Sequence, residues 1–193
     1  MTRRDDPRRH WDERHAGESV GEPSQFLVSL ADELPRRGRA IDLAGGRGRH
    51  ALWLADHGLE VTLADVSLVA LETAQAEAAE RGIELTLLEV DLEREAMPAG
   101  PWDVIVCFHY LHRPLFPPMI EALRAGGVLA VEIATVHNLQ RHDRPPRAFL
   151  LQEGELTSLT RGLQPITYTE GWTESGRHNA RYAGRKPGPD ERR

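Results

Sequence analysis

Cysteine and long apolar runs are both scarce in this sequence of 193 residues. Cys107 is the only cysteine, which excludes an intramolecular disulfide and a metal site built on cysteine pairs. No segment approaches about 18 consecutive apolar residues, the length that signals a membrane span. The N-terminus lacks the apolar stretch of a secretory signal peptide. We therefore expect a cytoplasmic protein with no membrane partner.

A continuous basic surface is also missing. The net charge is −6, acidic and basic residues are mixed along the chain, and Lys186 is the only lysine. The densest basic cluster is short and lies near the N-terminus, where a solvated tail accounts for it; its members are Arg3, Arg4, Arg8 and Arg9. Because a basic face is the usual mark of nucleic-acid binding, we expect no nucleic-acid partner. A monomer or a homodimer is expected.

The length suits one domain with a substantial core. Both ends are charged and contain proline, so we expect a single domain over residues 1–193 with flexible ends at 1–10 and 185–193. Between those ends, short apolar runs alternate with helical patterns, which is typical of βαβ units and a parallel sheet.

This alternation assigns each element a range. The expected strands are 40–43, 60–64, 83–88, 102–108, 128–133, 165–169 and a weak, polar last strand at 178–183. The expected helices are 24–34, 49–57, 68–81, 117–124 and 153–161. Residues 134–149 show little periodicity and are expected to form a long loop or lid. The pattern predicts an α/β fold with a doubly wound, mostly parallel seven-stranded sheet and a C-terminal antiparallel hairpin.

A carboxylate and a glycine turn follow the first expected strand. Asp42 lies at the end of that strand. Gly45, Gly46 and Gly48 form the turn that follows, and a helix begins at Arg49. Turns of this kind present backbone N–H groups to nucleoside cofactors. Asp42 would repel a pyrophosphate and attract a cation, by about 4 kcal/mol at roughly 4 Å and an effective dielectric near 20. S-adenosylmethionine (SAM) carries an ammonium and a sulfonium, and therefore fits this site.

Two further carboxylates follow the next strands. Asp65 could accept hydrogen bonds from both ribose hydroxyls, and Asp91 could accept one from an adenine amino group. Other interpretations stay open. The Gly46-x-Gly48-x-x-Ala51 spacing also satisfies the dinucleotide fingerprint. Asp42 and Asp65 could be ordinary residues at strand ends, and Asp91 could simply start a helix.

The residues from Asp42 to Arg49 resemble motif I of class I SAM-dependent methyltransferases. The wider pattern resembles a small bacterial branch that includes the tellurite-resistance methyltransferases. The matching segments are 11–14, 23–27, 61–67, 110–115, 126–129, Glu132 and 149–156. One departure is Ala44, which stands where the motif has its first glycine.

The resemblance implies a SAM site and its product, S-adenosylhomocysteine. Asp42 and the backbone from Gly46 to Gly48 would hold the methionine end, Asp65 the ribose, and Asp91 with Leu92 the adenine. The residues assigned to the cofactor are Asp42, Ala44, Gly46, Gly48, Asp65, Val66, Asp91, Leu92 and Cys107. The end of strand four, from Cys107 through Tyr110, would present the methyl group to the acceptor.

Methyl transfer needs a general base only if the acceptor must lose a proton. The candidates for catalysis are His109, Tyr110 and His112, with His137 as a further possible base. No carboxylate or thiol set joins the histidine pair after strand four, so no metal is expected. Alternatively, His112 through Pro114 brace the loop. Arg113, Arg141 and Arg144 could attract an anionic acceptor, or could be solvated.

These patterns favour a SAM-dependent methyltransferase with a small-molecule acceptor. No separate recognition domain is visible, and Cys107-Phe108-His109-Tyr110 stands where amino-methylating enzymes have Asn-Pro-Pro-Tyr. Two alternatives remain. One is an NAD(P)-dependent oxidoreductase that uses the same glycine turn. The other is a SAM-binding module without catalysis, which the polar last strand and the lack of a secure base would suit.

Overall fold

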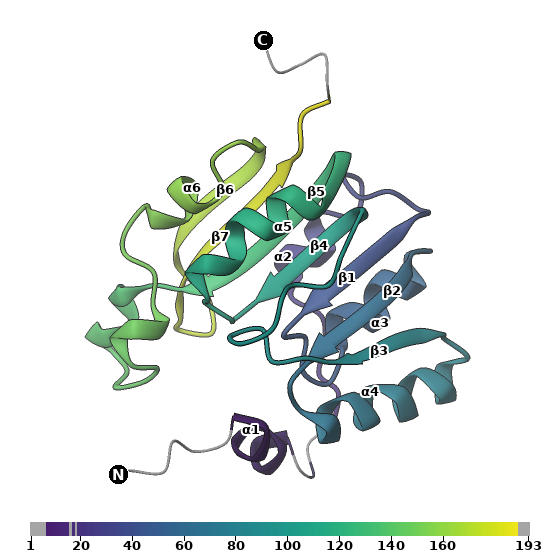
Figure 1. Cartoon of the computed structure of the whole chain (residues 1–193). Coiled ribbons are helices and arrows are strands. Elements are labelled where there is room, and N and C mark those ends of the chain that lie inside the picture. Colours follow the sequence, from purple (N-terminus) through teal and green to yellow (C-terminus); the bar gives the residue numbers. More distant parts are fainter. Residues whose placement is uncertain (1–6, 16, 18, 189–193) are drawn as a thin grey trace. The chain divides into compact units, whose positions relative to one another are not determined.

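The computed structural model describes residues 7–15, 17 and 19–188. The chain divides into two compact units, residues 1–96 and 97–193, and both are drawn in Figure 1. The single domain over 1–193 stays a prediction. Of the ends expected to be flexible, residues 1–6 and 189–193 lie outside the described residues. Residues 7–10 instead form the start of a helix, and Arg185 ends a strand.

The first unit is built on three parallel strands. These are β1 (Arg39–Leu43), β2 (Glu60–Asp65) and β3 (Leu85–Glu89), hydrogen-bonded in the order β3-β2-β1. Helices α3 (Arg49–Asp56) and α4 (Leu68–Arg81) connect them, so each strand-to-strand step is a βαβ unit (Figure 1). The parallel pairing places the C-terminal ends of β1 and β2 side by side, which brings Asp42 and Asp65 to one edge.

Helix α4 begins and ends where its sequence predicts. The Ser67 side chain accepts a hydrogen bond from the Ala70 N–H, which caps the first turn. Gly82 ends the helix in the left-handed conformation, at φ +66°, which a residue without Cβ adopts readily. The buried face of α4 consists of Ala70, Leu71, Ala74 and Ala78. The helix therefore lies close to the sheet, because most of these side chains are small.

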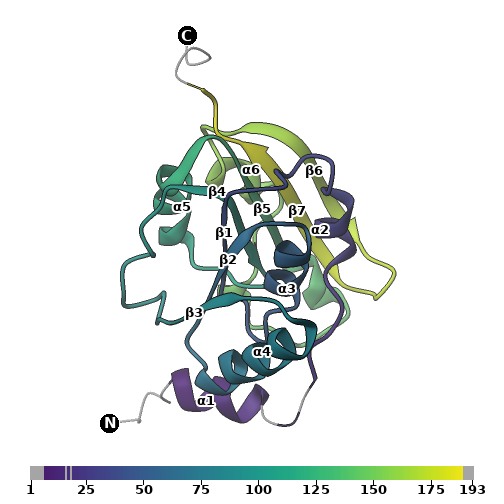
Figure 2. The same ribbon diagram turned by 90° about the vertical axis from the view of Figure 1, so that its right-hand side faces the viewer.

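The N-terminal helices differ from expectation. Helix α2 (Gln25–Ser29) is shorter than the predicted 24–34, because the chain continues after Ser29 in i→i+3 turns such as Glu33 N–H to Leu30 O, 2.9 Å. Helix α1 (Pro7–His15) was not predicted at all and has no buried residue. It lies beside α4 in Figure 2. An ion pair of 3.1 Å joins Arg8 of α1 to Glu89 of β3.

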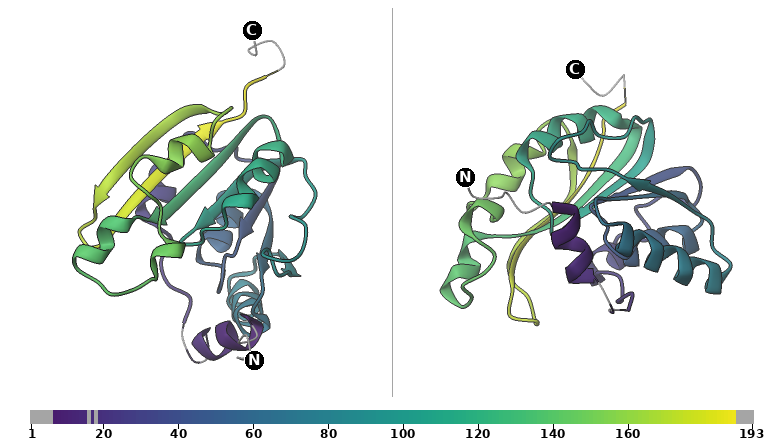
Figure 3. Two further views of the ribbon diagram at one scale, coloured as in Figure 1. Left: turned by 60° about the vertical axis from the view of Figure 1, so that its left-hand side comes forward. Right: turned by 60° about the horizontal axis from the view of Figure 1, so that its bottom comes forward.

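The second unit holds a mixed sheet. Its strands are β4 (Trp102–Phe108), β5 (Leu123–Ala134), β6 (Gln164–Trp172) and β7 (His178–Arg185), in the order β4-β5-β7-β6. Strands β4 and β5 are parallel, whereas β7 is antiparallel to both β5 and β6. Helix α5 (Phe116–Ala122) follows the 3₁₀ turn η1 (Arg113–Leu115), and helix α6 is Glu155–Leu159. Figure 3 shows β7 between β5 and β6.

The last strand is well formed, which corrects the expectation of a weak strand. It pairs along its length with β5 on one side and β6 on the other. Ala180, Tyr182 and Ala183 are buried. Its polar side chains Asn179 and Arg181 bond to Glu132 of β5. The polar groups of this strand therefore have hydrogen-bond partners inside the sheet.

The segment predicted as a long loop is more ordered than expected. It contains the 3₁₀ turns η2 (Val136–Gln140) and η3 (Arg147–Phe149). Leu151 forms a parallel bridge to Thr135, with hydrogen bonds from Leu151 N–H to Ala134 O (3.0 Å) and from Val136 N–H to Leu151 O (2.9 Å). The segment is therefore fastened to the C-terminal end of β5.

The predicted fold class is confirmed. The described residues hold seven strands, of which β1 to β5 run in parallel pairs and β6–β7 form the antiparallel C-terminal hairpin. Among the residues that the structure describes, no helix is both long enough and apolar enough to span a membrane.

Candidate functional site

The glycine turn after β1 has a backbone that ordinary side chains disfavour. Ala44 has φ +51°, Gly46 φ +55° and Gly48 φ +76°, all in the left-handed region. At Gly45 the restriction is space, because a Cβ there would overlap the Asp42 carboxylate and the Leu63 side chain. The turn therefore passes directly over the end of β1 and leads into α3.

Asp42 lies under this turn and has no exposed surface. Its Oδ2 accepts a hydrogen bond of 3.1 Å from the Ala51 N–H in the first turn of α3. Its Oδ1 is buried and has no hydrogen-bond partner among the described residues. An unsatisfied buried oxygen is uncommon and requires an explanation. A ligand that donates a hydrogen bond is one such explanation.

Burial also changes the charge of Asp42. Desolvation, opposed by the Ala51 hydrogen bond and reinforced by the nearby charge of Asp65, raises its pKa to about 8. At pH 7 the protonated form of Asp42 therefore predominates in the ligand-free protein. Asp42 is therefore not the fixed negative charge that its sequence position predicts. A cationic ligand would draw the proton off, because a nearby positive charge lowers the pKa of a carboxyl group.

Asp65 joins the glycine turn to the end of β2. Its Oδ2 accepts a hydrogen bond of 2.8 Å from the Gly46 N–H, and its Oδ1 accepts one of 2.9 Å from the Ser67 N–H. Only 6% of the residue is exposed. Each carboxylate oxygen can accept a second bond, so this geometry leaves acceptor sites for ribose hydroxyls. Val66 lies between Asp65 and Ser67 in the chain.

Asp91 has a local role in the structure. Its Oδ1 accepts a hydrogen bond of 3.1 Å from the Glu93 N–H, and its Oδ2 lies 3.4 Å from Arg94 Nε. Its own N–H donates to Glu95 Oε1 at 2.9 Å. These contacts form the turn after β3. They agree with the alternative in which Asp91 starts a turn or helix instead of binding adenine. Leu92 is buried beside it.

Helix α1 lies over the glycine turn. The His15 ring is the nearest group to the Cβ position of Gly46, with Cε1 3.3 Å away. His15 Nδ1 lies 3.2 Å from Arg47 Nη1, and the Trp11 ring stacks on His15 with centroids 5.7 Å apart. Trp11 thus covers this turn through His15. Trp11 lies in the 11–14 segment, which is one of the segments that carry the family resemblance.

Asp12 fastens α1 to α4. Its Oδ1 accepts hydrogen bonds from the Ser67 hydroxyl (2.6 Å) and the Val69 N–H (3.3 Å) at the start of α4. A carboxylate at a helix N-terminus is favoured by the helix dipole. Sequence reasoning did not identify Asp12 or His15. Asp12 lies within the 11–14 segment of the family resemblance, and His15 directly follows that segment.

In the second unit, the candidate catalytic residues follow β4. His109 is exposed and has φ +58°, an uncommon conformation for a residue with Cβ, and its N–H donates to Glu132 O at 2.7 Å. The Tyr110 and His112 rings lie 6.5 Å apart. Cys107 is buried, with its Sγ 3.8 Å from Tyr110 O. Strained residues cluster at functional sites, which favours His109 among these candidates.

Arg113 braces the segment before α6. Its Nε and Nη2 donate to the two oxygens of Glu155, at 2.5 and 2.9 Å, and Nη2 also donates to Leu150 O at 3.1 Å. The Arg113 bond lowers the pKa of Glu155 and raises that of Arg113. The Arg113 guanidinium is thus engaged within the protein, as the bracing interpretation expects, rather than available to an anionic acceptor.

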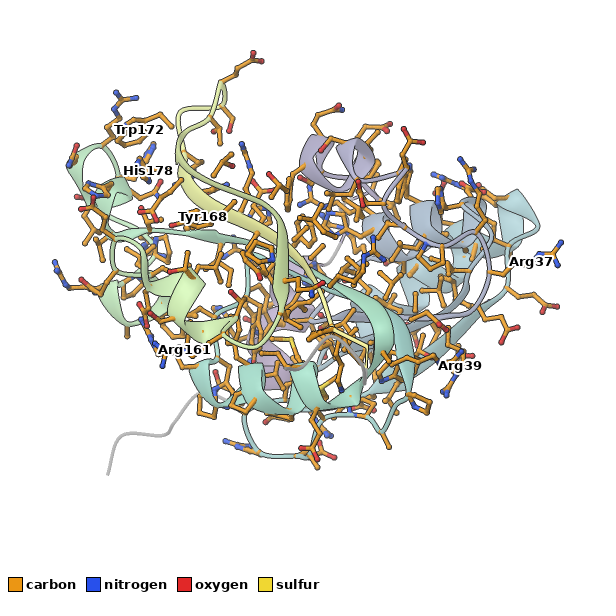
Figure 4. All side chains as sticks on the ribbon, turned by 90° about the horizontal axis from the view of Figure 1, so that it is seen from above. Arg37, Arg39, Arg161, Tyr168, Trp172 and His178 are labelled. Carbon is orange, nitrogen blue, oxygen red and sulfur yellow. The ribbon has the colours of Figure 1, made fainter. Side chains whose placement is uncertain are left out.

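Aromatic rings gather where β6 ends and β7 begins, around Trp172 and His178 in Figure 4. The His137 and His178 ring centroids are 4.7 Å apart, and Thr135 Oγ1 lies 2.7 Å from His178 Nδ1. Burial, and next the neighbouring His137, lower the pKa of His178. The Arg141 guanidinium lies 3.7 Å from the centroid of the Trp172 ring. Arg141 is therefore held on the protein surface by a cation–π contact.

Among the described residues, no three His, Cys, Asp or Glu side chains come together in a group that could hold a metal ion. The first unit does fit a cationic nucleoside cofactor. Asp42 offers an unpartnered buried oxygen, Gly45 leaves no room for a side chain under the turn, and Asp65 is anchored beside it.

Comparisons with known proteins find methyltransferases among the proteins similar to this chain. Residues 40–127 match the family model described as a methyltransferase domain. The chain is 26% identical over 145 residues to the tRNA 5-carboxymethoxyuridine methyltransferase of Escherichia coli, a match that covers 70% of this chain and 56% of the relative. The chain spans about half the length of the curated relatives it matches.

Solved structures share the fold. TehB from Haemophilus influenzae superposes with a TM-score of 0.72 at 20% identity, covering 85% of this chain and 62% of TehB. The 1,6-didemethyltoxoflavin-N1-methyltransferase of Burkholderia thailandensis, solved with 1,6-didemethyltoxoflavin and S-adenosylhomocysteine bound, has a TM-score of 0.64 at 20% identity, covering 84% of this chain and 77% of that chain. Residues 40–127 of this chain therefore match a methyltransferase-domain family, and the chain shares its fold with TehB and with the 1,6-didemethyltoxoflavin-N1-methyltransferase.

Proposed function

We propose that this protein transfers a methyl group from SAM to a small-molecule acceptor. The observation that carries the proposal is the pair of carboxylates at the glycine turn, with one oxygen of Asp42 buried and unpartnered among the described residues and Asp65 bonded to the Gly46 N–H. A hydrogen-bond donor with positive charge would satisfy Asp42 and favour its ionised form, whereas a pyrophosphate would oppose that ionisation.

The site residues of the first unit have separate roles in this proposal. Asp42 would bind the ammonium of SAM, and the backbone from Ala44 through Gly48 would surround its methionine end. Asp65 and Val66 would hold the ribose, and Asp91 with Leu92 would flank the adenine. His15 and Trp11 of α1 would exclude water from the turn, since their rings already cover Gly46.

When bound, SAM supplies an electrophilic methyl group and leaves as S-adenosylhomocysteine. The second unit would position and activate the acceptor. His109 would remove the proton of a neutral hydroxyl or thiol acceptor as the new bond forms, with Tyr110 and His112 close to it in the chain and Cys107 buried at the end of β4. An acceptor that is already an anion would need positioning and dehydration but no base.

The contacts of two arginines on the described surface favour a small acceptor. Arg113 is engaged with Glu155, and Arg141 is stacked on Trp172, so neither extends a basic face for a nucleic acid. The Escherichia coli relative acts on tRNA by its name, which makes tRNA the alternative acceptor to test. The second alternative is dinucleotide binding at the Gly46-x-Gly48-x-x-Ala51 turn.

Calorimetry of the full chain with SAM, S-adenosylhomocysteine, NAD and NADP tests the cofactor. We expect binding of the two adenosyl sulfur compounds and none of the dinucleotides; binding of a dinucleotide alone would refute the proposal. Methyl transfer from radiolabelled SAM to thiol, phenol and amine acceptors, and to total tRNA, tests the acceptor. Labelling of tRNA with no labelling of small molecules would overturn the small-acceptor assignment.

A further inference from the structure

A charged cluster lies inside the sheet of the second unit. Asn179 Nδ2 and Arg181 Nε both donate to Glu132 Oε1, at 2.7 and 3.1 Å. Glu132 is on β5 and the other two residues are on β7, where Glu132 is the register partner of Arg181. Only 6% of the Glu132 side chain is exposed, against 30% of the Arg181 side chain. The cluster therefore has a buried carboxylate and a partly open guanidinium.

Fold stability does not explain this cluster. The residues of β5 from Val128 to Ile133 are all buried, and the others among them are apolar. A buried ion pair contributes little net stability, because desolvation of both charges offsets their attraction. An apolar pair at these positions would serve the core as well. A buried carboxylate that holds an arginine in one place is better explained by a function of that arginine.

The geometry leaves the outer edge of Arg181 available. Its contact with Glu132 uses Nε alone, and neither Nη1 nor Nη2 has a partner among the residues that the structure describes. A guanidinium held at Nε keeps a fixed plane, so the two Nη groups point in a defined direction. Two parallel N–H donors in that arrangement match a carboxylate or another planar oxyanion.

The cluster is next to the end of β4. Phe108 is the register partner of Glu132 in the parallel β4–β5 pair. The His109 N–H donates to the Glu132 carbonyl at 2.7 Å. Glu132 thus contacts the candidate base through its backbone and Arg181 through its side chain. In open α/β sheets, ligands bind at the C-terminal ends of the strands, and β4 and β5 both end here.

We propose that Arg181 binds an oxyanion group, a carboxylate in the first instance, of the methyl acceptor. Glu132 is a positioning residue that holds Arg181. Asn179 is a positioning residue that holds Glu132. The inference rests on the proposed function, since it names the class of small molecule that the enzyme methylates. The acceptor would then carry an anionic group at a fixed distance from the atom that receives the methyl group.

Direct binding tests the site without turnover. The full chain, with and without S-adenosylhomocysteine, is titrated with benzoate, phenylphosphonate and benzamide, and binding is followed by ligand-observed NMR. We expect benzoate to bind more tightly than the neutral benzamide. Arg181→Gln should weaken benzoate binding about tenfold, the loss expected for hydrogen bonds to a charged group. Binding of phenylphosphonate by the same residue would extend the site to phosphate-type anions.

Arg185→Gln is the matched control. Arg185 lies on the same strand and the same sheet face, but at the other end of β7, and it should leave benzoate binding unchanged. Arg181→Lys keeps the charge without the forked donors, so it should lose most of the benzoate affinity; it also decides the matter if Arg181→Gln fails to fold.

Two results would overturn the inference: benzoate binding no tighter than benzamide, or equal binding in the Arg181 and Arg185 variants. Failure of the proposed function would appear differently, as a lack of SAM and S-adenosylhomocysteine binding in the wild-type chain. The S-adenosylhomocysteine affinity should be the same in all three arginine variants, which separates an acceptor site from a general loss of structure.

Discussion

The Gly46 N–H donates a 2.8 Å hydrogen bond to Asp65 Oδ2, so the turn after β1 and the end of β2 are held together by a side chain. The second oxygen of the same carboxylate accepts the Ser67 N–H just before α4. One carboxylate therefore sets the position of both loops at this edge of the first unit.

Asp65→Asn is expected to weaken SAM binding. The amide can accept only through one oxygen, so at least one of the two backbone bonds or a ribose bond is lost. Each hydrogen bond to a charged group contributes about 1.5–3 kcal/mol, which corresponds to roughly ten- to hundredfold in Kd. Calorimetry gives the Kd directly. Asp56→Asn, at the exposed end of α3, is the control and should leave it unchanged; an unaltered Kd in Asp65→Asn would place the ribose elsewhere.

SAM binding is expected to release a proton near pH 7. Burial raises the pKa of Asp42 to about 8 in the ligand-free protein, and a bound ammonium would lower it again, so a carboxyl that is mostly protonated before binding becomes ionised. Titrations in buffers with different ionisation heats measure the number of protons released. Asp42→Asn should abolish the release. Identical heats in all buffers for the wild-type chain would mean that Asp42 does not face the cation.

The same carboxyl has a sign-defined effect on stability. Its pKa is higher in the folded chain than the ordinary value of 3.8, so the folded state holds a proton that the unfolded state has lost between about pH 4 and pH 8. The contribution of Asp42 to the free energy of unfolding therefore falls as the pH rises through this range. Relative to wild type, Asp42→Asn should become more stable with rising pH, as measured by urea unfolding; a constant difference would contradict the raised pKa.

Ala44→Gly and Gly45→Ala should differ in their effect on the free energy of unfolding. Ala44→Gly relieves a left-handed φ but loosens the unfolded chain, so its free energy of unfolding should stay within about 1 kcal/mol of wild type. Gly45→Ala forces a Cβ against the Asp42 carboxylate and should destabilise by about 1–3 kcal/mol. Thermal and urea unfolding compare the two. Equal stability of the two variants would show that the turn is looser than its contacts imply.

His109→Ala should lower turnover much more than cofactor binding. A general base contributes about 10²–10⁴ in rate, and SAM affinity should not change because His109 follows β4 rather than the glycine turn. Single-turnover rates and the SAM Kd separate the two effects. His57→Ala, at the end of α3, is the control for loss of an imidazole. A weaker SAM Kd with an unchanged rate would make His109 a structural residue.

The parts of the molecule that were predictable are those set by local sequence. Ser67 and Gly82 mark the ends of α4 because capping depends on residues within one turn. Asp42 and Asp65 stand at strand ends because alternating βαβ units place them there. Helix α1 was missed since it buries no residue and therefore has no apolar stripe.

Other features depend on contacts distant in sequence. Asp12 bonds to Ser67 across 55 residues, and Arg181 bonds to Glu132 across 49. No local pattern reveals such pairs. The raised pKa of Asp42 likewise arises from burial by the folded chain, which composition does not report. The polarity of β7 misled the prediction for the same reason, because its partner on β5 could not be seen.

The contact between Asp12 and the start of α4 has a practical consequence for expression of shortened chains. The segment that matches the methyltransferase domain, residues 40–127, begins after α1 and stops before the paired charges of β5 and β7. A fragment cut to those limits would retain the glycine-rich loop yet lack the Trp11 and His15 rings and the Glu132–Arg181 pair. Boundaries for crystallisation or screening should therefore be drawn outside Pro7 and Arg185.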